Sequence, residues 1–330
     1  TAATDAAFGG FTARALTGSG STLYAVDSFG GIERNTGTWA EVRRNNNDDL
    51  QGVTMVGGTP YAAGGNPGGS GTVLRYDGSA WQRDVQLAPN TFYGIAGSAA
   101  NDIWAVGEAG TIWQYDGTSW QGRTSGLTGP LNAIAAFDTQ NVWAVGGGGT
   151  LLRYNGSFFS TVSIGASGVL RGVWAASATD VWTVGSGGQA FHYTGTNWTA
   201  PSSGVTSGLN AVHGTDGSHV WAVGDAGVIR FWDGSAWTPV TSGTGSNLRA
   251  VWAVSATEIW AVGDAGTVQR STGGAFSAVS PPVGTAMNIL AVWGNVNATF
   301  VLTDSTVYRY AGGSWSTLPA TAVTGLRALA

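Results

Sequence analysis

The chain has 330 residues, of which only 10% are charged, and it contains 54 glycines and 16 tryptophans. Charged residues make up roughly 25% of an average soluble protein, so this composition indicates many tight turns and many buried aromatic side chains. The chain has no cysteine and no lysine, which excludes disulfides, thiolate metal sites and catalysis by either side chain. A net charge of −5 with scattered arginines argues against nucleic acid as a partner.

The chain begins with TAATDAAFGG, which has neither a basic segment nor an apolar core. We interpret residues 1–11 as an N-terminal extension and expect a secreted or cell-surface protein whose signal peptide has been removed. No apolar run approaches the roughly 18 residues of a membrane span. We therefore expect no membrane span.

A repeat of about 39 residues extends from 12 to 324. Its marker is Ile/Val-Trp-Ala/Thr-Val-Gly, in which the tryptophan recurs at intervals of 39 residues as Trp104, Trp143, Trp182, Trp221 and Trp260. Weaker copies place Tyr24 and Tyr61 at the tryptophan position before this series and Val301 after it. A fixed period of this length is the signature of a repeat architecture, and it predicts eight units.

Each repeat is predicted to form four short antiparallel strands, which are clearest in residues 209–240. We name these strands a to d in chain order. Asp-Gly pairs at 77/78, 116/117 and 233/234 separate strands c and d and are typical of type I′ hairpin turns. Because no segment has a helical period, we predict an all-β propeller of about eight four-stranded antiparallel blades in a single domain, 1–330.

Two features of the repeat concern packing and closure. The tryptophans of strand b, and the aromatic residues of strand d, are predicted to fill the wedges between neighbouring blades. Strand a occurs nine times, from 12–16 to 325–330, whereas the other strands occur eight times. We expect residues 325–330 to close the ring on blade one and the N-terminal copy to be displaced or to add an edge.

One strand c position carries a basic residue in most repeats. It is occupied by Arg34, Arg75, Arg153, His192, Arg270 and Arg309, and it is interrupted by Gln114 and Phe231. Alternation along the strand directs Arg153 into the groove toward a neighbouring blade, where its stem can lie on an aromatic ring. We consider both a structural clamp across the blades and a repeated ligand site.

A second candidate site comes from departures from the repeat. The segments 43–49 and 64–71 belong to connections that leave the same face of the propeller, so we expect them to be neighbours. Their polar side chains form a candidate ligand-binding patch: Arg43, Arg44, Asn45, Asn46, Asn47, Asp48, Asp49 and Asn66. The alternative is a solvated surface loop without a ligand.

We assign no catalytic residue, no metal site and no cofactor. The histidines, His192, His213 and His219, lack a third partner at metal-ligand spacing. Asp225 and Asp264 occupy a repeated turn position, where they are better interpreted as turn formers than as an acid/base pair.

The stretch IWAVGEAGTIWQYDGTSW, residues 103–120, resembles the tectonin-type propeller repeat, and 259–272 also resembles sialidase-like and photosystem-assembly propellers. The aspartate box of sialidases is degenerate here, and the WD-repeat and kelch signatures are missing. The tectonin resemblance implies carbohydrate recognition between or within blades. We therefore expect a non-catalytic, carbohydrate-binding (lectin or adhesion) propeller, with a glycan or a surface protein as partner and oligomerisation as an option.

Two other functions remain open from the sequence. A protein-interaction scaffold is consistent with the same fold, because propellers host many functions. A polysaccharide lyase or glycosidase is the third alternative.

Overall fold

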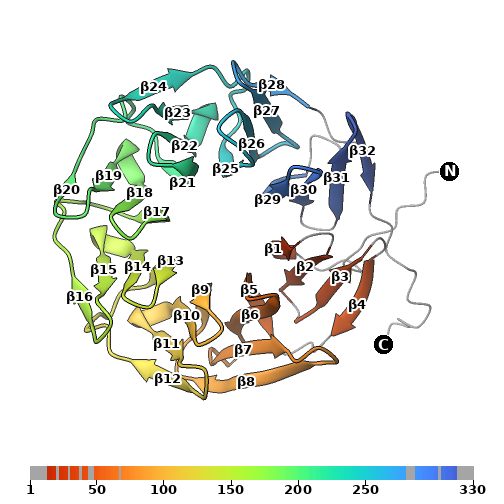
Figure 1. Cartoon of the computed structure of the whole chain (residues 1–330), viewed down its shortest axis with the longest axis vertical. Helices are drawn as coiled ribbons and strands as arrows, with labels where there is room; N and C mark the ends of the chain where they lie inside the picture. Colours follow the sequence, from red (N-terminus) through yellow and green to blue (C-terminus); the bar gives the residue numbers. More distant parts are fainter. Residues whose placement is uncertain are drawn as a thin grey trace.

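The computed structural model describes residues 13–19, 22–28, 30–36, 39–43, 48–66, 68–279, 287–303 and 306–317. Within these residues the strands form eight four-stranded sheets, which follow one another around a ring in chain order (Figure 1). All strand pairs within a sheet are antiparallel, as between β13 (Leu131–Asp138) and β14 (Asn141–Gly146). The predicted eight-bladed β-propeller is therefore confirmed. No described helix is long and apolar enough to cross a membrane.

The strands of the first four blades have the following bounds. Blade one contains β1 (Ala13–Ser19), β2 (Thr22–Asp27), β3 (Ile32–Asn35) and β4 (Trp39–Arg43); blade two contains β5 (Asp49–Val56), β6 (Thr59–Gly65), β7 (Gly71–Tyr76) and β8 (Trp81–Ala88). Blade three contains β9 (Phe92–Ala99), β10 (Asp102–Gly107), β11 (Ile112–Tyr115) and β12 (Trp120–Arg123), and blade four ends with β15 (Leu151–Tyr154) and β16 (Phe159–Thr161).

The remaining blades repeat this order. Blade five contains β17 (Leu170–Ser177), β18 (Asp180–Gly185), β19 (Ala190–Tyr193) and β20 (Trp198–Thr199); blade six contains β21 (Leu209–Asp216), β22 (His219–Gly224), β23 (Ile229–Trp232) and β24 (Trp237–Val240). Blade seven contains β25 (Leu248–Ala253), β26 (Glu258–Gly263), β27 (Val268–Thr272) and β28 (Ser277–Ala278); blade eight contains β29 (Ile289–Asn295), β30 (Ala298–Thr303), β31 (Val307–Ala311) and β32 (Ser314–Thr317).

The N-terminal copy of strand a is not displaced, so this prediction was wrong. β1 pairs with β2 from Ala13 to Ser19 and is the inner strand of blade one. The physical reason is that β1 makes apolar contacts on both sides: Leu16 packs against blade eight, and Ala15 packs against blade two. The C-terminal copy, residues 325–330, lies outside the described residues.

The strand b tryptophans are buried between blades, as predicted. Trp104, Trp143, Trp182, Trp221 and Trp260 are between 0% and 4% exposed. All except Trp221 meet aromatic residues from strands c and d of the next blade, and Trp143 lies 5.0 Å from Tyr193 and 5.3 Å from Trp198 between ring centroids. A repeated aromatic triad therefore fills the seams at Trp104, Trp143, Trp182 and Trp260.

The last repeat differs from its predicted alignment. The residue of blade eight that holds the tryptophan position is Phe300 and not Val301, because Phe300 pairs with Trp293 as Trp260 pairs with Trp252. Phe300 packs toward blade one, whereas Val301 packs against Trp260 on the opposite face. A shift of one residue along a strand moves a side chain to the other face of the sheet.

The glycine of the Trp-Ala-Val-Gly motif is required by a close approach of two backbones. At Gly146 and Gly224 the backbone is extended, with φ of −162° and −163°, so any residue could adopt the conformation. A Cβ at either position would, however, overlap the carbonyl oxygen of the residue that precedes strand a of the same blade. This contact brings the end of strand b against the start of strand a.

The hairpins between strands c and d form where predicted, but their Asp-Gly turns are not of type I′. Tyr76 pairs with Trp81, so the turn spans four residues, 77–80. Asp77 Oδ1 accepts the backbone N–H groups of Ser79 and Ala80, each at 2.8 Å, and only Gly78 has a positive φ. The aspartate therefore acts by capping the turn with its side chain.

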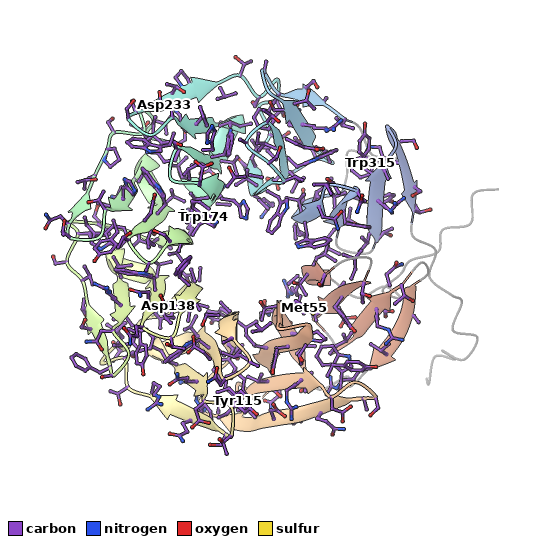
Figure 2. All side chains as sticks on the ribbon, in the orientation of Figure 1. Met55, Tyr115, Asp138, Trp174, Asp233 and Trp315 are labelled. Atoms are coloured by element: carbon purple, nitrogen blue, oxygen red, sulfur yellow. The ribbon has the colours of Figure 1, made fainter. Side chains whose placement is uncertain are left out.

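Aromatic side chains of strand a form an arc along the inner wall of blades five to eight. His213 lies between Trp174 and Trp252, with ring centroids 5.8 Å and 4.3 Å away, and Trp293 continues the arc. Figure 2 shows Trp174 at the inner edge of the ring. The His213 Nδ1 atom accepts the N–H of Ala253 in blade seven at 3.2 Å, so this histidine joins two blades in its neutral form.

His213 should make stability depend on pH. Burial lowers the pKa of His213 to about 4, whereas an unfolded histidine has a pKa of about 6.5. The unfolded state therefore binds the proton first, and the stability that is present above pH 6.5 falls as the pH decreases to about 4, by about 3 kcal/mol. Urea unfolding at several pH values measures the free energy of unfolding of the wild type and of His213→Gln. We expect that of the wild type to fall more steeply as the pH decreases. Parallel pH profiles of the two proteins would contradict it.

Candidate ligand-binding groove

The strand c cation forms a clamp across the seam in blade four. The Arg153 guanidinium carbon lies 5.1 Å from the ring centroid of Trp143 and 5.3 Å from that of Tyr193 in blade five. Its Nη1 donates to the Tyr193 hydroxyl and its Nη2 donates to Asn141 Oδ1, each at 3.0 Å. The predicted orientation of Arg153 is confirmed, and both of its terminal nitrogens donate to protein partners.

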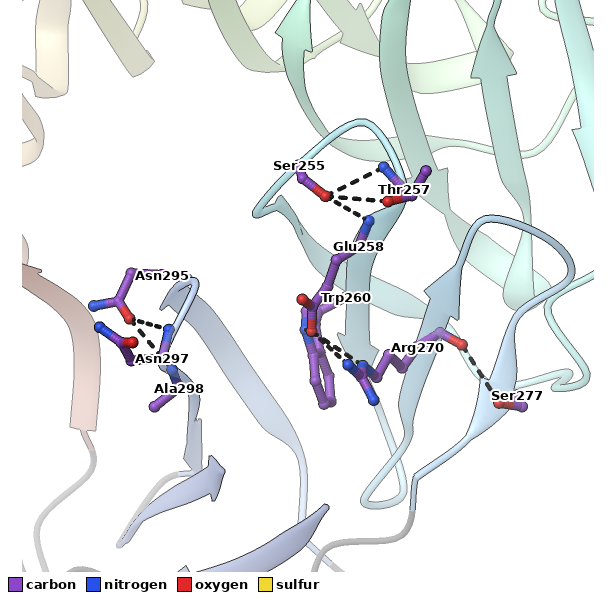
Figure 3. Close-up of polar contacts among 9 residues, drawn as sticks. All are labelled: Ser255, Thr257, Glu258, Trp260, Arg270, Ser277, Asn295, Asn297 and Ala298. Atoms are coloured by element: carbon purple, nitrogen blue, oxygen red, sulfur yellow. Dashed lines mark hydrogen bonds and ion pairs between the residues drawn. The ribbon is translucent and has the colours of Figure 1, made fainter. Parts of the chain in front are cut away.

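Blade seven contains the same arrangement with a carboxylate on strand b. Figure 3 shows that Arg270 reaches Glu258, whose Oε1 accepts hydrogen bonds from the arginine Nε at 3.1 Å and Nη2 at 2.8 Å. The guanidinium lies over Trp260 of its own blade and Tyr310 of blade eight, at 5.2 Å and 5.4 Å from the ring centroids. This seam too is closed by side chains of the protein.

Other residues at this position find equivalent partners. His192 stacks on Trp182 with centroids 3.9 Å apart, and its Nε2 lies 2.9 Å from Asp180 Oδ1. Gln114 is buried and accepts the Arg123 Nε–H at 2.9 Å. Three further members occupy the same register position: Arg34, which donates to the Tyr76 hydroxyl at 3.2 Å, Phe231 opposite Trp221, and Arg309 opposite Phe300.

Arg75 in blade two departs from this pattern. Strand b begins with Thr59, whereas blades three, four, five and seven hold an acidic or amide side chain at this position, and Arg75 pairs with Asp84 on β8 instead. Its Nε donates to Asp84 Oδ2 at 2.8 Å and its Nη2 to Oδ1 at 3.3 Å. The Arg75 side chain is 34% exposed and that of Asp84 is 12% exposed. The guanidinium side of this ion pair is therefore accessible to solvent.

At the seam between blades two and three, Tyr61 occupies the strand b position that holds tryptophan in five other blades. Tyr115 and Trp120, the partners that the triad supplies from blade three, pack on each other with centroids 5.6 Å apart. A hollow of about 360 Å³ lies beside them and is lined by Arg75, Asp84, Val85, Trp113, Tyr115, Thr118, Ser119 and Trp120. A hollow therefore lies at the seam where tyrosine takes the place of tryptophan.

A second hollow of about 480 Å³ adjoins the first through Arg75 and Tyr115. Its walls come from blades one to three, and its residues include three more tyrosines, Tyr24, Tyr61 and Tyr76, together with the turn residues Gly58, Thr59, Pro60, Asp77, Gly78 and Ala100. We call the two hollows together the Arg75 groove. It opens on the face that carries the turns between strands a and b and between strands c and d.

The polar patch predicted at 43–49 and 64–71 is partly described. The two segments are neighbours, because Asp49 pairs with Gly65. Asp48 is 2% exposed and accepts Arg43 Nη2 at 2.8 Å and Arg83 Nη2 at 2.7 Å. Asn66 Oδ1 caps its own loop by accepting the N–H groups of Gly68 and Ser70. Residues 44–47 lie outside the described residues.

The remaining polar candidates have structural partners. Asp225 Oδ1 accepts an N–H of Asn210, and Asp264 accepts from Asn247 and Arg249, so both turn carboxylates tie neighbouring strands together. His219 Nδ1 lies 2.8 Å from Asp216 Oδ1. No group of three or more potential metal ligands occurs in the described part of the chain.

Comparisons with known proteins identify the fold alone. No family model matches the chain, and no curated protein matches it in sequence. Among solved structures, the computationally designed Ika8 protein superposes with a TM-score of 0.77 at 16% identity, covering 92% of this chain and 97% of its own. The chain thus belongs, by architecture, with the β-propellers.

Two natural propellers with bound peptides are similar at equally low identity. Sqt1 of Chaetomium thermophilum, bound to the N-terminus of ribosomal protein L10, has a TM-score of 0.72 and 14% identity, covering 96% of this chain and 100% of its own. YCF48 bound to a D1 peptide has a TM-score of 0.58 and 16% identity, with coverages of 91% and 92%. Similarity at this level of sequence identity establishes a shared fold only. The function must therefore be inferred from the geometry of the candidate site.

Proposed function

We propose that this chain is a non-catalytic binding propeller that holds a carbohydrate in the Arg75 groove. The observation that carries the proposal is the seam at Tyr61, one of the positions where the repeat lacks its tryptophan, because a hollow lies there beside Tyr115 and Trp120. Features that all blades share serve the fold. A ligand can bind where one blade differs from the repeat in a way that leaves a hollow.

The chemistry of the groove suits a sugar. Sugars offer apolar ring faces, which pack on aromatic side chains, and hydroxyl groups, which need both donors and acceptors. Trp113, Tyr115 and Trp120 are half-buried and supply the aromatic surface. Arg75 donates to Asp84 through Nε and Nη2. Its Nη1 takes part in neither bond and can donate to a ligand. The tectonin-type resemblance of the repeat also supports this function.

A peptide ligand is the second candidate. It is favoured by the bound peptides of the Sqt1 and YCF48 structures, which share the propeller fold with this chain. An aromatic groove with an exposed arginine could also accept peptide side chains. A glycan array and a peptide array probed with the same purified protein separate the two, because we expect signals on the glycan array alone.

Restoring the repeat at the open seam should abolish binding. In Tyr61→Trp the larger indole takes up space in the larger hollow, which Tyr61 lines, so we expect glycan affinity to fall at least tenfold while thermal stability is kept or increased. Isothermal titration calorimetry and a melting curve measure the two effects on one sample.

Arg153→Ala is the matched control for this experiment. It removes the cation that corresponds to Arg75 at the closed seam between blades four and five, so it should lower the melting temperature and leave glycan affinity unchanged. Unaltered affinity in Tyr61→Trp, or lost affinity in Arg153→Ala, would contradict the assignment of the site.

A further inference from the structure

In the Arg75 groove, the positive charge of Arg75 is neutralised by the carboxylate of Asp84. Arg75 and Asp84 form a two-point ion pair, and the remaining charged residue that lines either hollow is Asp77, on the rim of the larger one. From this arrangement we propose that the groove binds a neutral oligosaccharide across two adjacent subsites and rejects the anionic forms of the same glycan. This inference rests on the proposed carbohydrate-binding function.

The shape of the groove supports two subsites. The smaller hollow has the aromatic wall of Trp113, Tyr115 and Trp120, whereas the larger hollow has a wall of tyrosines, Tyr24, Tyr61 and Tyr76. Both include Arg75 and Tyr115, so these two residues stand at the junction. A ligand of at least two sugar rings can therefore contact both walls while its linkage lies over Arg75.

The charges favour an uncharged ligand. Asp84 Oδ2 also receives the Trp120 indole N–H at 3.4 Å, which holds this carboxylate at the wall of the smaller hollow. Hydrogen bonds from the backbone N–H groups of Ala80 and Ser79 lower the pKa of Asp77, so it stays ionised at neutral pH. An anionic sugar would approach two carboxylates and one cation that is already paired. Arg34, whose guanidinium carbon lies 5.9 Å from the ring centroid of Tyr76, donates a hydrogen bond to the Tyr76 hydroxyl.

Two classes of ligand group fit the open side of Arg75. Hydroxyl and acetamido oxygens accept hydrogen bonds from a guanidinium without bringing a charge. Carboxylate and sulfate oxygens accept stronger hydrogen bonds, but they bring a negative charge toward Asp77 and Asp84, and like charges at close range disfavour binding. The expected discrimination is therefore electrostatic and should weaken as salt is added.

Asp77→Asn tests the inference without disturbing the turn. Blade four already carries Asn155 at the equivalent turn position, and its Oδ1 accepts the N–H groups of Ser157 and Phe158 as Asp77 accepts those of Ser79 and Ala80. The variant should therefore remove one charge and keep the backbone. Asp233→Asn, the same change in blade six, is the control far from the groove.

The experiment compares matched glycans on the full chain. An array presents lactose, cellotriose, maltotriose and chitotriose beside sulfated and sialylated forms, and the strongest neutral member and its anionic counterpart are then titrated by calorimetry at low salt. We expect the wild type to bind the neutral glycan at least tenfold more tightly. Asp77→Asn should narrow this ratio of affinities, because it removes one negative charge from the rim, whereas Asp233→Asn should leave the ratio unchanged.

The outcomes distinguish the two levels of the proposal. Tighter binding of the anionic glycan, or a ratio of affinities that Asp77→Asn leaves unchanged, overturns the selectivity and leaves carbohydrate binding standing. Binding of neither form, with a positive signal for a peptide, overturns the carbohydrate function and the selectivity together. Neutral trisaccharides that bind no more tightly than their monosaccharides contradict the two subsites.

Discussion

Trp143→Ala should lower the free energy of unfolding by about 3 to 5 kcal/mol, as do other truncations of large aromatic residues in protein cores. Trp143 is fully buried, and its ring meets Tyr193 and Trp198 from blade five. The substitution leaves a cavity in the seam and removes the ring on which Arg153 lies. Both effects act in the same direction.

Chemical denaturation of Trp143→Ala and Tyr93→Ala measures this effect with a control. Tyr93 is 38% exposed, and truncation of an exposed side chain typically changes stability by about 0.5 kcal/mol or less. An unfolding midpoint for Trp143→Ala equal to that of the wild type would mean that the seam does not depend on the strand b tryptophan.

The second large effect is expected at Asp48, which lies between blades one and two. Its side chain is 1% exposed and lies between two arginines, Arg43 and Arg83, whose side chains are 14% and 21% exposed. Asp48→Asn keeps the size of the side chain and removes its charge, which leaves two like charges with little access to water. Loss of one partner from a buried ion pair costs about 3 to 5 kcal/mol.

A surface ion pair provides the contrast for Asp48. Arg171 and Asp225 are 3.9 Å apart with side chains 38% and 44% exposed, and exposed pairs contribute about 0 to 1 kcal/mol. Asp225→Asn should therefore have a small effect in the same denaturation experiment. Equal losses in the two variants would show that the burial of Asp48 does not decide its contribution.

The repeat period made the fold predictable. Tryptophans at a constant spacing, glycine after each Trp-Ala-Val segment and polar turns between short strands agree with one another, and such consistency across levels specifies a single architecture. Prediction failed where the copies are weak. Phe300 was missed because a neighbouring valine also fits the pattern, and only the pairing with Trp293 determines the register.

The candidate groove was predictable only in part. Arg75 was identified from its repeat position, and Tyr61 was identified as a substitute for tryptophan. The sequence could not reveal that Arg75 pairs with Asp84. The repeat offers no precedent for this pair, because in blade seven the equivalent arginine, Arg270, pairs with Glu258 on strand b and not with a residue of strand d. It also could not reveal the hollow, because the space depends on how Tyr115 and Trp120 of the next blade pack. The replacement of tryptophan by a smaller ring was the available signal.

The stoichiometry of glycan binding tests the central claim most directly. The closed seams at Arg153 and Arg270 leave their guanidinium groups bonded to the protein, whereas the seam at Tyr61 is open. Calorimetric titration of the wild type with the neutral oligosaccharide selected on the array should therefore give one site per chain, and Tyr61→Trp should remove it. Several equivalent sites per chain, or a single site that persists in Tyr61→Trp, would contradict the assignment of ligand binding to the Arg75 groove.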